Sequence, residues 1–402
     1  MAQSSPADPC PVVNEKITNR APHSISLAGM TLSRTRIDRF MLTSHSDGDR
    51  RPRHGYGGRP SLKSALRELT RKSPAAARLI FGAAEIAKRA KGAGYYWADF
   101  RRYGRVMTWR TGRRDYWKVS SELIFQHHKL EKGLCLPPPL RFFGKDAADK
   151  TLELMAEWRN AGLALDHPVY RAALDILKAY RDRLDVTPPP TDFGPDLIRR
   201  IDAMLADFNP ERSLPTPILP AQMPADAAAS LHAIALGRRS VRAFDGKPVD
   251  FALVEKALTT AQLSPSACNR QPWRTHFYDR REDIDALLRL QNGNSGFGRT
   301  IPLLAVVTAD CSSFFGMVER IEPVLDAGLF LSTFLLAMQA NGLSSCCLNW
   351  CVPPDRDLKA HEIGKIPAEH QIVTFLAIGT HEPGVQVPRS HRRPLEDCVI
   401  RH

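Results

Sequence analysis

The C-terminal half of the chain alternates between helical and strand spacing of its hydrophobic positions. Apolar residues recur every three or four positions in 226–237, 250–261 and 322–340, which predicts three helices. Short apolar runs bounded by turn residues predict about four strands, at 276–278, 303–308, 345–349 and 372–378. Strands and helices in this irregular order predict an α+β fold with a sheet sandwiched by helices.

One of these helices, 322–340, carries apolar residues nearly all round. Leu325, Leu329 and Leu336 belong to this pattern. A helix that is hydrophobic on every side is usually buried. We therefore expect this helix to lie in the core of the C-terminal domain.

The N-terminal half shows helical spacing without strand signals. The predicted helices lie at 61–91, 122–132, 146–159, 168–184 and 195–208. Pro74 divides the first of them, with Ser73 as the cap of the second piece. Residues 1–60 are rich in Ser, Pro, Arg and Asp, and residues 209–225 are rich in Pro. The pattern thus predicts four segments: a disordered basic arm at 1–60, a helical domain at 61–208, a Pro-rich linker at 209–225 and an α+β domain at 226–402.

Composition places the chain among globular proteins of ordinary hydrophobicity. It has 402 residues, of which 43% are hydrophobic, and it carries eight cysteines. The sequence contains no run of about 18 apolar residues, so we expect no transmembrane helix. The N-terminus shows no apolar signal-peptide core, so we expect a cytoplasmic protein with reduced thiols. A misassigned start codon would also account for the arm.

The net charge of +13 is concentrated upstream of the α+β domain. Residues 61–118 contain 15 Lys or Arg against four Asp or Glu, whereas residues 226–402 contain 19 of each. Aromatic residues alternate with this charge between Tyr95 and Trp117. Three interpretations remain open: helices with aromatic cores and solvated cations, weak peripheral contact of 61–118 with an anionic membrane, or nucleic-acid binding. No nucleic-acid module accompanies the charge, so we expect no nucleic acid as a partner.

Two clusters contain metal-ligand residue types, but neither forms a complete set. His127 and Glu131 lie four residues apart on one helical face. Cys346, Cys347 and Cys351 lie on and after a predicted strand, where adjacent side chains point to opposite faces. We expect a capping or interhelical role for the first cluster, buried thiols for the second, and no metal site.

Two motifs in the α+β domain carry the candidate chemistry. The first, 238–244, reads Arg-Arg-Ser-Val-Arg-Ala-Phe and gathers guanidiniums and a hydroxyl in one short segment, which suits a phosphate dianion. The second, 264–273, reads Ser-Pro-Ser-Ala-Cys-Asn-Arg-Gln-Pro-Trp. Its amide side chains can donate and accept, which suits the edge of a heterocycle. Together they are typical of a nucleotide-like cofactor site.

In this order and spacing, the two motifs resemble those of the nitroreductase family of FMN-dependent oxidoreductases. The resemblance covers roughly residues 226–402. It implies a mixed sheet sandwiched by helices, a homodimer whose interface builds the FMN sites, and ping-pong transfer of hydride from NADH or NADPH to an organic acceptor. The helical extension is similar to one that precedes nitroreductase-like domains in some polysaccharide-biosynthesis proteins.

The resemblance also implies which residues bind FMN. Four parts of the chain match positions that bind flavin in the family. They are the segments around the two motifs, a Gly-Asn element, the strand at 345–349 and the basic C-terminus. In the Gly-Asn element, Asn292 is the alternative to Asn294. At the C-terminus, either Arg392 or Arg393 would bind the phosphate. One position that is basic in the family's closing motif holds another residue in this chain. The candidate FMN-binding residues are Arg238, Arg239, Ser240, Arg242, Pro265, Ser266, Ala267, Asn269, Gln271, Asn294, Leu348, Asn349, Arg392 and Arg393.

The expected function is therefore an FMN-dependent NAD(P)H oxidoreductase acting on a small nitro, quinone or biosynthetic acceptor. The alternative is a low-turnover flavin-binding assembly or regulatory protein, linked to polysaccharide biosynthesis. The flavin itself carries the hydride chemistry, so no catalytic side chain is assigned.

Overall fold

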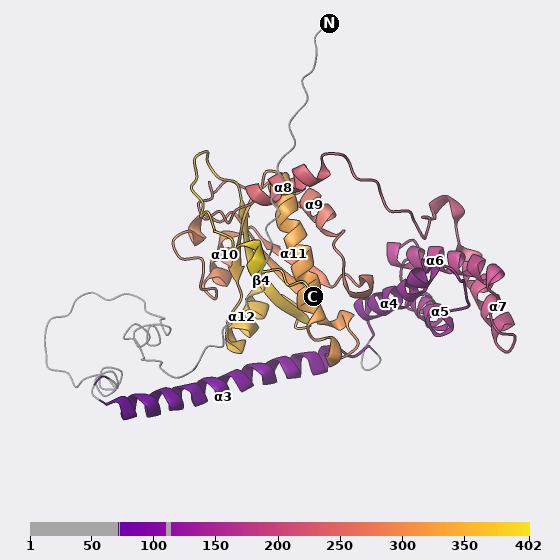
Figure 1. Cartoon of the computed structure of the whole chain (residues 1–402), viewed down its shortest axis with the longest axis horizontal. Coiled ribbons are helices and arrows are strands. Elements are labelled where there is room, and N and C mark those ends of the chain that lie inside the picture. The colour runs from indigo at the N-terminus through magenta and orange to yellow at the C-terminus, as the bar shows by residue number, and fades with distance from the viewer. Residues whose placement is uncertain (1–70, 72, 110–113) are drawn as a thin grey trace, which may run out of the picture. The chain divides into compact units, whose positions relative to one another are not determined.

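A computed structural model describes residues 71, 73–109 and 114–402 of the chain (Figure 1). The chain divides into two units, residues 1–78 and 79–402. The predicted arm at 1–60 lies outside the described residues, as does the start of the first predicted helix. The boundaries of the four predicted segments stay predictions.

The C-terminal half is built on a four-stranded sheet, as its hydrophobic pattern predicts. The strands are β1 (Trp273–Tyr278), β2 (Leu303–Asp310), β3 (Ser344–Asn349) and β4 (His370–Gly379). Their order is β1-β2-β4-β3, and each neighbouring pair is antiparallel. An isolated parallel bridge joins Ser240 to Ser345 and extends the sheet beyond β3. The α+β class is confirmed.

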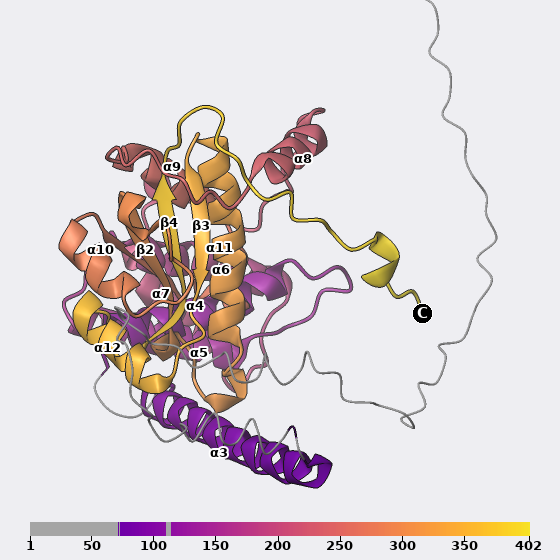
Figure 2. The ribbon, with the colours of Figure 1, turned by 90° about the vertical axis from the view of Figure 1, so that its left-hand side faces the viewer.

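Helices cover both faces of this sheet (Figure 2). On one face, α9 (Phe251–Ala261) and α11 (Glu322–Ala340) form a core with Ala305 and Val307. On the other face, α10 (Arg281–Leu288) and α12 (Pro354–Gly364) pack against Leu304 and Val306. Alternate residues of β2 thus face opposite layers, as the two-residue period of a strand requires. The sequence pattern missed α10 and α12, which are short helices.

The helix α11 is less buried than its sequence predicts. Phe330, Phe334 and Met338 are buried on the sheet, but Leu325 and Leu329 are 50% and 39% exposed. Among the described residues, a single helix, Met317–Ala340, is long and apolar enough to cross a membrane by length and composition. Its buried residues form a core with β2, whereas Leu325 and Leu329 on its other side stay partly exposed.

The helices α4 (Tyr116–Leu134), α5 (Lys145–Asn160), α6 (Pro168–Val186) and α7 (Gly194–Met204) form their own hydrophobic core. Trp158, Tyr170 and Tyr180 are its largest buried side chains. Gly133 is required by the packing, because a Cβ there would lie 2.0 Å from the ring of Phe143. The predicted helices of this region are confirmed, with boundaries shifted by a few residues.

Two further helices have mostly exposed surfaces. The helix α3 (Pro74–Val106) begins as predicted, with Ser73 Oγ accepting a hydrogen bond from Ala76 N–H at 3.3 Å. The helix α8 (Ala227–Gly237) ends at the predicted glycine but contains no buried residue. Between Ser213 and Asp226, a stretch described throughout, no helix or strand forms.

Candidate functional site

The first motif follows α8 and lies beside the edge strand β3. Val241 N–H donates to the carbonyl of Ser345 at 3.1 Å. Val241 and Phe244 are buried in the core that contains α10 and α12. These two anchors leave Arg242 exposed and Arg238 half-buried at the sheet edge.

The guanidiniums of this motif are not neutralised by the described part of the chain. Among the described residues, no carboxylate forms an ion pair with Arg238, Arg239 or Arg242. The Arg239 guanidinium donates to the Arg238 carbonyl at 2.9 Å. Burial raises the pKa of the Cys346 thiol, whereas the charge of Arg242 opposes that rise. The first motif therefore presents cationic donors that an external anion can use.

The second motif has an unusual backbone conformation. Cys268, Asn269 and Gln271 have φ angles of 51°, 57° and 52°, in the left-handed region that non-glycine residues rarely adopt. Ala267 N–H donates to both carboxylate oxygens of Asp326, each at 3.1 Å, and Gln271 N–H donates to Ser266 Oγ at 3.1 Å. Backbone strain of this kind costs about 1–3 kcal/mol per residue and concentrates at functional sites.

Arg270 holds this strained segment in place. It is buried, and its guanidinium forms a bidentate ion pair with Glu319, with N–O distances of 3.1 and 2.7 Å. It also donates to the carbonyls of Ala267 at 2.9 Å and Ser313 at 3.2 Å. Its charge lies 4.3 Å from the ring centre of Phe314. The sequence did not reveal this role, because Ser313, Phe314 and Glu319 lie more than 40 residues from Arg270 along the chain.

The amide groups of the second motif face the helical region. Gln271 Nε2 donates to the Asn269 carbonyl at 3.0 Å and to its side-chain oxygen at 3.2 Å. Asn269 is exposed and lines a cavity of about 640 Å³, together with residues of α4, α6 and 214–218. The helical region therefore adjoins the segment that the sequence predicts to contact flavin.

The two motifs lie near opposite ends of α11. Ala267 binds Asp326 in the second turn of the helix. At the other end, Gly237, next to Arg238, lies beside Gln339, 3.7 Å from the position of a Cβ. Thirteen residues of α-helix span about 20 Å. One chain therefore does not bring both motifs to one small ligand.

A third group of predicted residues lies at the end of β3. Gln291, which is buried, donates to the Asn349 carbonyl at 3.0 Å and to its side chain at 3.2 Å. Asn294 donates to the carbonyls of Leu288 at 2.9 Å and Gln291 at 3.1 Å. Asn294 therefore stabilises its own loop, and Leu348, whose side chain is buried, could contact a ligand only through its backbone.

The competing Asn292 accepts a hydrogen bond from Arg356 at 3.0 Å. The sequence reasoning missed Gln291, which links the two segments.

The basic C-terminus does not join the first motif within one chain. Arg392 and Arg393 are exposed. Arg392 donates to the Ser390 carbonyl at 2.5 Å, and Arg393 lies 3.6 Å from Asp397. No hydrogen bond or ion pair connects either residue to 238–242 among the residues that the structure describes.

Neither candidate metal cluster forms in the described part of the chain. His128, and not His127, binds Glu131, at 2.8 Å. His127 is buried with both ring nitrogens unpartnered, and burial lowers its pKa to about 4. Cys346 and Cys347 point to opposite faces as predicted, but Cys347 and Cys351 are exposed, so the expectation that all three thiols are buried is wrong.

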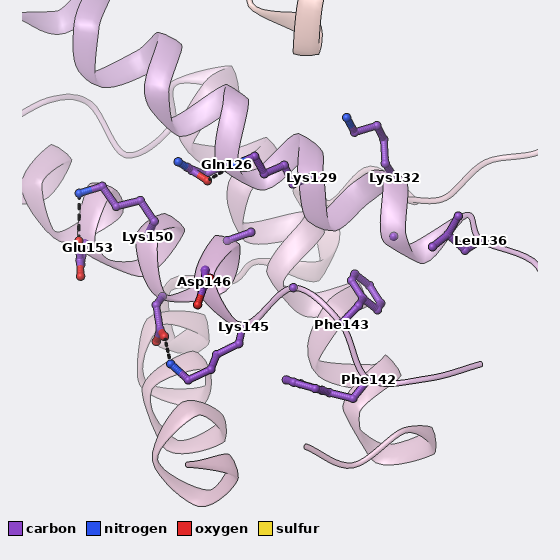
Figure 3. A pocket seen from close by; sticks show the side chains of 14 residues that line it. Gln126, Lys129, Lys132, Leu136, Phe142, Phe143, Lys145, Asp146, Lys150 and Glu153 are labelled. Carbon is purple, nitrogen blue, oxygen red and sulfur yellow. Dashed lines mark hydrogen bonds and ion pairs between the residues drawn. The ribbon is translucent and has the colours of Figure 1, made fainter. Parts of the chain in front are cut away.

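A cavity of the helical region lies between α4 and the start of α5 (Figure 3). Its volume is about 990 Å³, and Phe142 and Phe143 form part of its wall. Lys145 binds Asp149 at 2.8 Å and Lys150 binds Glu153 at 3.0 Å. This cavity contains none of the candidate flavin residues.

The chain is similar to several known proteins. A model of the nitroreductase family matches residues 235–292. A 4-nitrobenzoate reductase from Nocardioides sp. (strain LMS-CY) is 25% identical over 226 residues, which cover 44% of this chain and 90% of that protein. A protein from Archaeoglobus fulgidus named for NADH dehydrogenase and NAD(P)H nitroreductase activity is 28% identical over 144 residues, covering 35% of this chain and 80% of the relative.

Solved structures also resemble the C-terminal half. An FMN-dependent nitroreductase from Clostridium difficile R20291 has 23% identity and a TM-score of 0.34, covering 39% of this chain and 90% of that one. A nitroreductase-like family protein from Bacillus cereus has 20% identity and a TM-score of 0.37, covering 46% and 99%. The family model spans both motifs, from just before Arg238 to just beyond Gln291. The C-terminal half of this chain therefore contains a nitroreductase-family domain.

Proposed function

We propose that this protein is an FMN-dependent oxidoreductase that accepts hydride from NADH or NADPH and passes it to an organic acceptor. The observation that carries this proposal is the group of guanidiniums at 238–242, which have no carboxylate partner among the described residues and lie beside the exposed edge of β3. The family match at 235–292 and the names of the relatives support the same assignment.

The residues present suit the parts of FMN. Arg238 and Arg242, with the Ser240 hydroxyl, would hold the phosphate and the polar chain, because guanidinium donors match phosphate oxygens. Backbone groups of Leu348 and Asn349 would meet the polar edge of the ring system. The bound flavin would supply the hydride chemistry, while these side chains would orient it and tune its electronics.

We also propose that the site is completed by a second copy of the chain. The second motif lies about 20 Å along α11 from the first. In a symmetric dimer, Asn269 and Gln271 of one subunit can approach the first motif of the other. Such a dimer would use the exposed apolar side of α11, with Leu325 and Leu329, and the helix α8, which has no buried residue.

The visible spectrum of the purified protein tests the cofactor. A yellow protein with flavin absorption, or a colourless one that takes up FMN stoichiometrically, supports the proposal. A protein that binds no FMN contradicts it. Light scattering on the flavin-loaded protein tests the assembly, because a loaded monomer would contradict the composite site.

The alternative, a flavin-binding assembly or regulatory protein with low turnover, is favoured by the large helical region beside the second motif. Rapid oxidation of NADH or NADPH with a quinone or nitroaromatic acceptor would exclude it. Stoichiometric FMN without turnover would favour it. Neighbouring genes for polysaccharide biosynthesis would then indicate the process that it serves.

A further inference from the structure

The helix α3 carries an apolar stripe that has no partner among the residues that the structure describes. Its positions alternate in steps of four and three residues, so they lie on one side of the helix. All eight are exposed: Leu79, Ala83, Ile86, Ala90, Ala93, Trp97, Phe100 and Gly104. Ile86 is 70% exposed and Trp97 is 59% exposed, with the Trp97 ring stacked on Phe100 at 5.2 Å. Large exposed apolar side chains in one line indicate an interaction surface.

The last turns of α3 attach it to the C-terminal domain. Tyr103 donates its hydroxyl to Gln371 Oε1 at 3.1 Å, and Arg102 forms an ion pair with Asp357. Tyr103 and Met107 are buried in a cluster with Cys311 and Phe314. The preceding six turns, by contrast, keep their apolar stripe in solvent. The attachment therefore uses a different side of the helix from the stripe.

Cations lie on every side of α3, whereas its acidic residues lie far from the stripe. At 100° per residue, Arg89, Arg101 and Arg105 lie within about 80° of its centre and on both sides of it. The two acidic residues of α3, Glu85 and Asp99, lie about 120° and 160° away. An apolar line edged by cations, with tryptophan in the line, is the arrangement of helices that lie in a membrane interface.

The same arrangement disfavours pairing with a second copy of α3. In a two-stranded coiled coil the charged residues beside the stripe would be Arg89 and Arg101, which have the same sign and no acidic partner. Trp97 and Gly104 would occupy central positions, where such coils prefer branched aliphatic residues. The stripe therefore fits an anionic surface better than a copy of itself.

We propose that α3 docks the protein on an anionic lipid surface, lying parallel to it with Ile86, Trp97 and Phe100 at headgroup depth. The nearby cations attract the acidic headgroups, and this attraction weakens as salt shortens the Debye length. The docking does not depend on flavin, since α3 contains none of the residues assigned to FMN. It places the flavin domain beside the membrane, where lipid-soluble acceptors are concentrated.

Flotation of the full-length protein with vesicles tests this proposal. We expect binding to phosphatidylcholine vesicles that contain phosphatidylglycerol, little binding to phosphatidylcholine alone, and release by high salt. Removal of two cations by R89Q and R101Q together should weaken binding about 30-fold, at about 1 kcal/mol each. The matched control is K88Q, whose cation lies on the far side of the helix and pairs with Glu85 at 3.5 Å.

The apolar contribution is tested separately. The double substitution I86S and W97S should abolish flotation while the circular dichroism spectrum and the elution volume without lipid stay unchanged. Brominated lipids should quench tryptophan fluorescence in the wild type, and W97F should bind with much less quenching. Because these substitutions leave the candidate FMN-binding residues intact, the flavin content of the variants should not change.

Three kinds of result would overturn the proposal. The first is absence of binding to anionic vesicles at low ionic strength. The second is binding that I86S and W97S leave intact, or that K88Q weakens as much as the Arg substitutions do. The third is a change of oligomeric mass with I86S and W97S in the absence of lipid, or equal binding of the protein to polyglutamate through the same residues. Either outcome would assign the stripe to a protein partner.

Discussion

Near the two ends of α11 lie two motifs that both contain arginine but differ in the surroundings of that arginine. At its N-terminal end, Arg270 is buried and binds a carboxylate and two backbone carbonyls. At its C-terminal end, Arg238 and Arg242 lie at a sheet edge without a carboxylate partner among the described residues. A guanidinium that is paired with a buried carboxylate stabilises a fold, whereas one without a carboxylate partner can bind an anionic ligand. Four predictions test this difference.

The largest effect is expected at Arg270. R270A leaves the Glu319 carboxylate without its partner in a largely buried position, and breaking a buried pair costs about 3–5 kcal/mol. We expect a loss of this size in the free energy of urea unfolding. R242A is the matched control and should change stability by less than about 0.5 kcal/mol. If R270A does not fold, E319Q should show a smaller loss in the same direction. Equal stability of R270A and R242A would contradict the comparison.

The second effect concerns FMN. Charge-assisted hydrogen bonds contribute roughly 1.5–3 kcal/mol each, so R238A with R242A should weaken FMN binding by at least about tenfold. Stability without FMN should be unchanged, because neither side chain is buried. Titration followed by flavin fluorescence measures the affinity. An unaltered dissociation constant would show that the phosphate binds elsewhere.

The third effect is a pH dependence at Asp326. Burial raises its pKa from 3.8 to about 6, although the Ala267 N–H and the charge of Arg270 oppose the rise. The folded protein therefore binds this proton more tightly than the unfolded chain does. The resulting stabilisation is complete below about pH 4 and is lost as the pH rises through about 6. We expect the difference in unfolding free energy between wild type and D326N to change over this interval. A constant difference between pH 4 and pH 7.5 would exclude a raised pKa.

The smallest effect is expected at Arg239. Its guanidinium already donates to the Arg238 carbonyl within the motif. R239A should change FMN affinity by less than about threefold, a difference below about 0.7 kcal/mol. The same fluorescence titration measures it. A loss as large as that of R238A with R242A would show that all three arginines bind the phosphate.

Local patterns predicted the elements of this protein well. The helix at 322–340 has the predicted limits, and the strands at 303–310 and 344–349 lie where their apolar runs indicated. Such elements are specified by residues close together in the sequence. The burial of individual side chains was predicted less well. One side of α11 is exposed although its sequence is apolar, because burial depends on which elements pack against the helix in space.

Long-range partners were beyond the reach of sequence patterns. Arg270 contacts Glu319, and Gln291 contacts Asn349, each pair separated by about 50 residues or more. The contacts of Asn294 with the carbonyls of Leu288 and Gln291 are local, but they depend on the loop conformation, which the apolar pattern does not specify. For the candidate site, the sequence identified segments, whereas the structure distinguishes residues with free donors from residues that hold the segments in place.

The separation of the two motifs along α11 has a genetic consequence. In a dimer with composite sites, each site takes its first motif from one subunit and its second motif from the other. A subunit defective at 238–242 and a subunit defective at 266–271 would each be inactive as a homodimer. Mixed in one heterodimer, they would restore one complete site and leave the other doubly defective. Two recessive alleles of this gene could therefore complement each other within a single cell, to at most half of the wild-type activity per dimer.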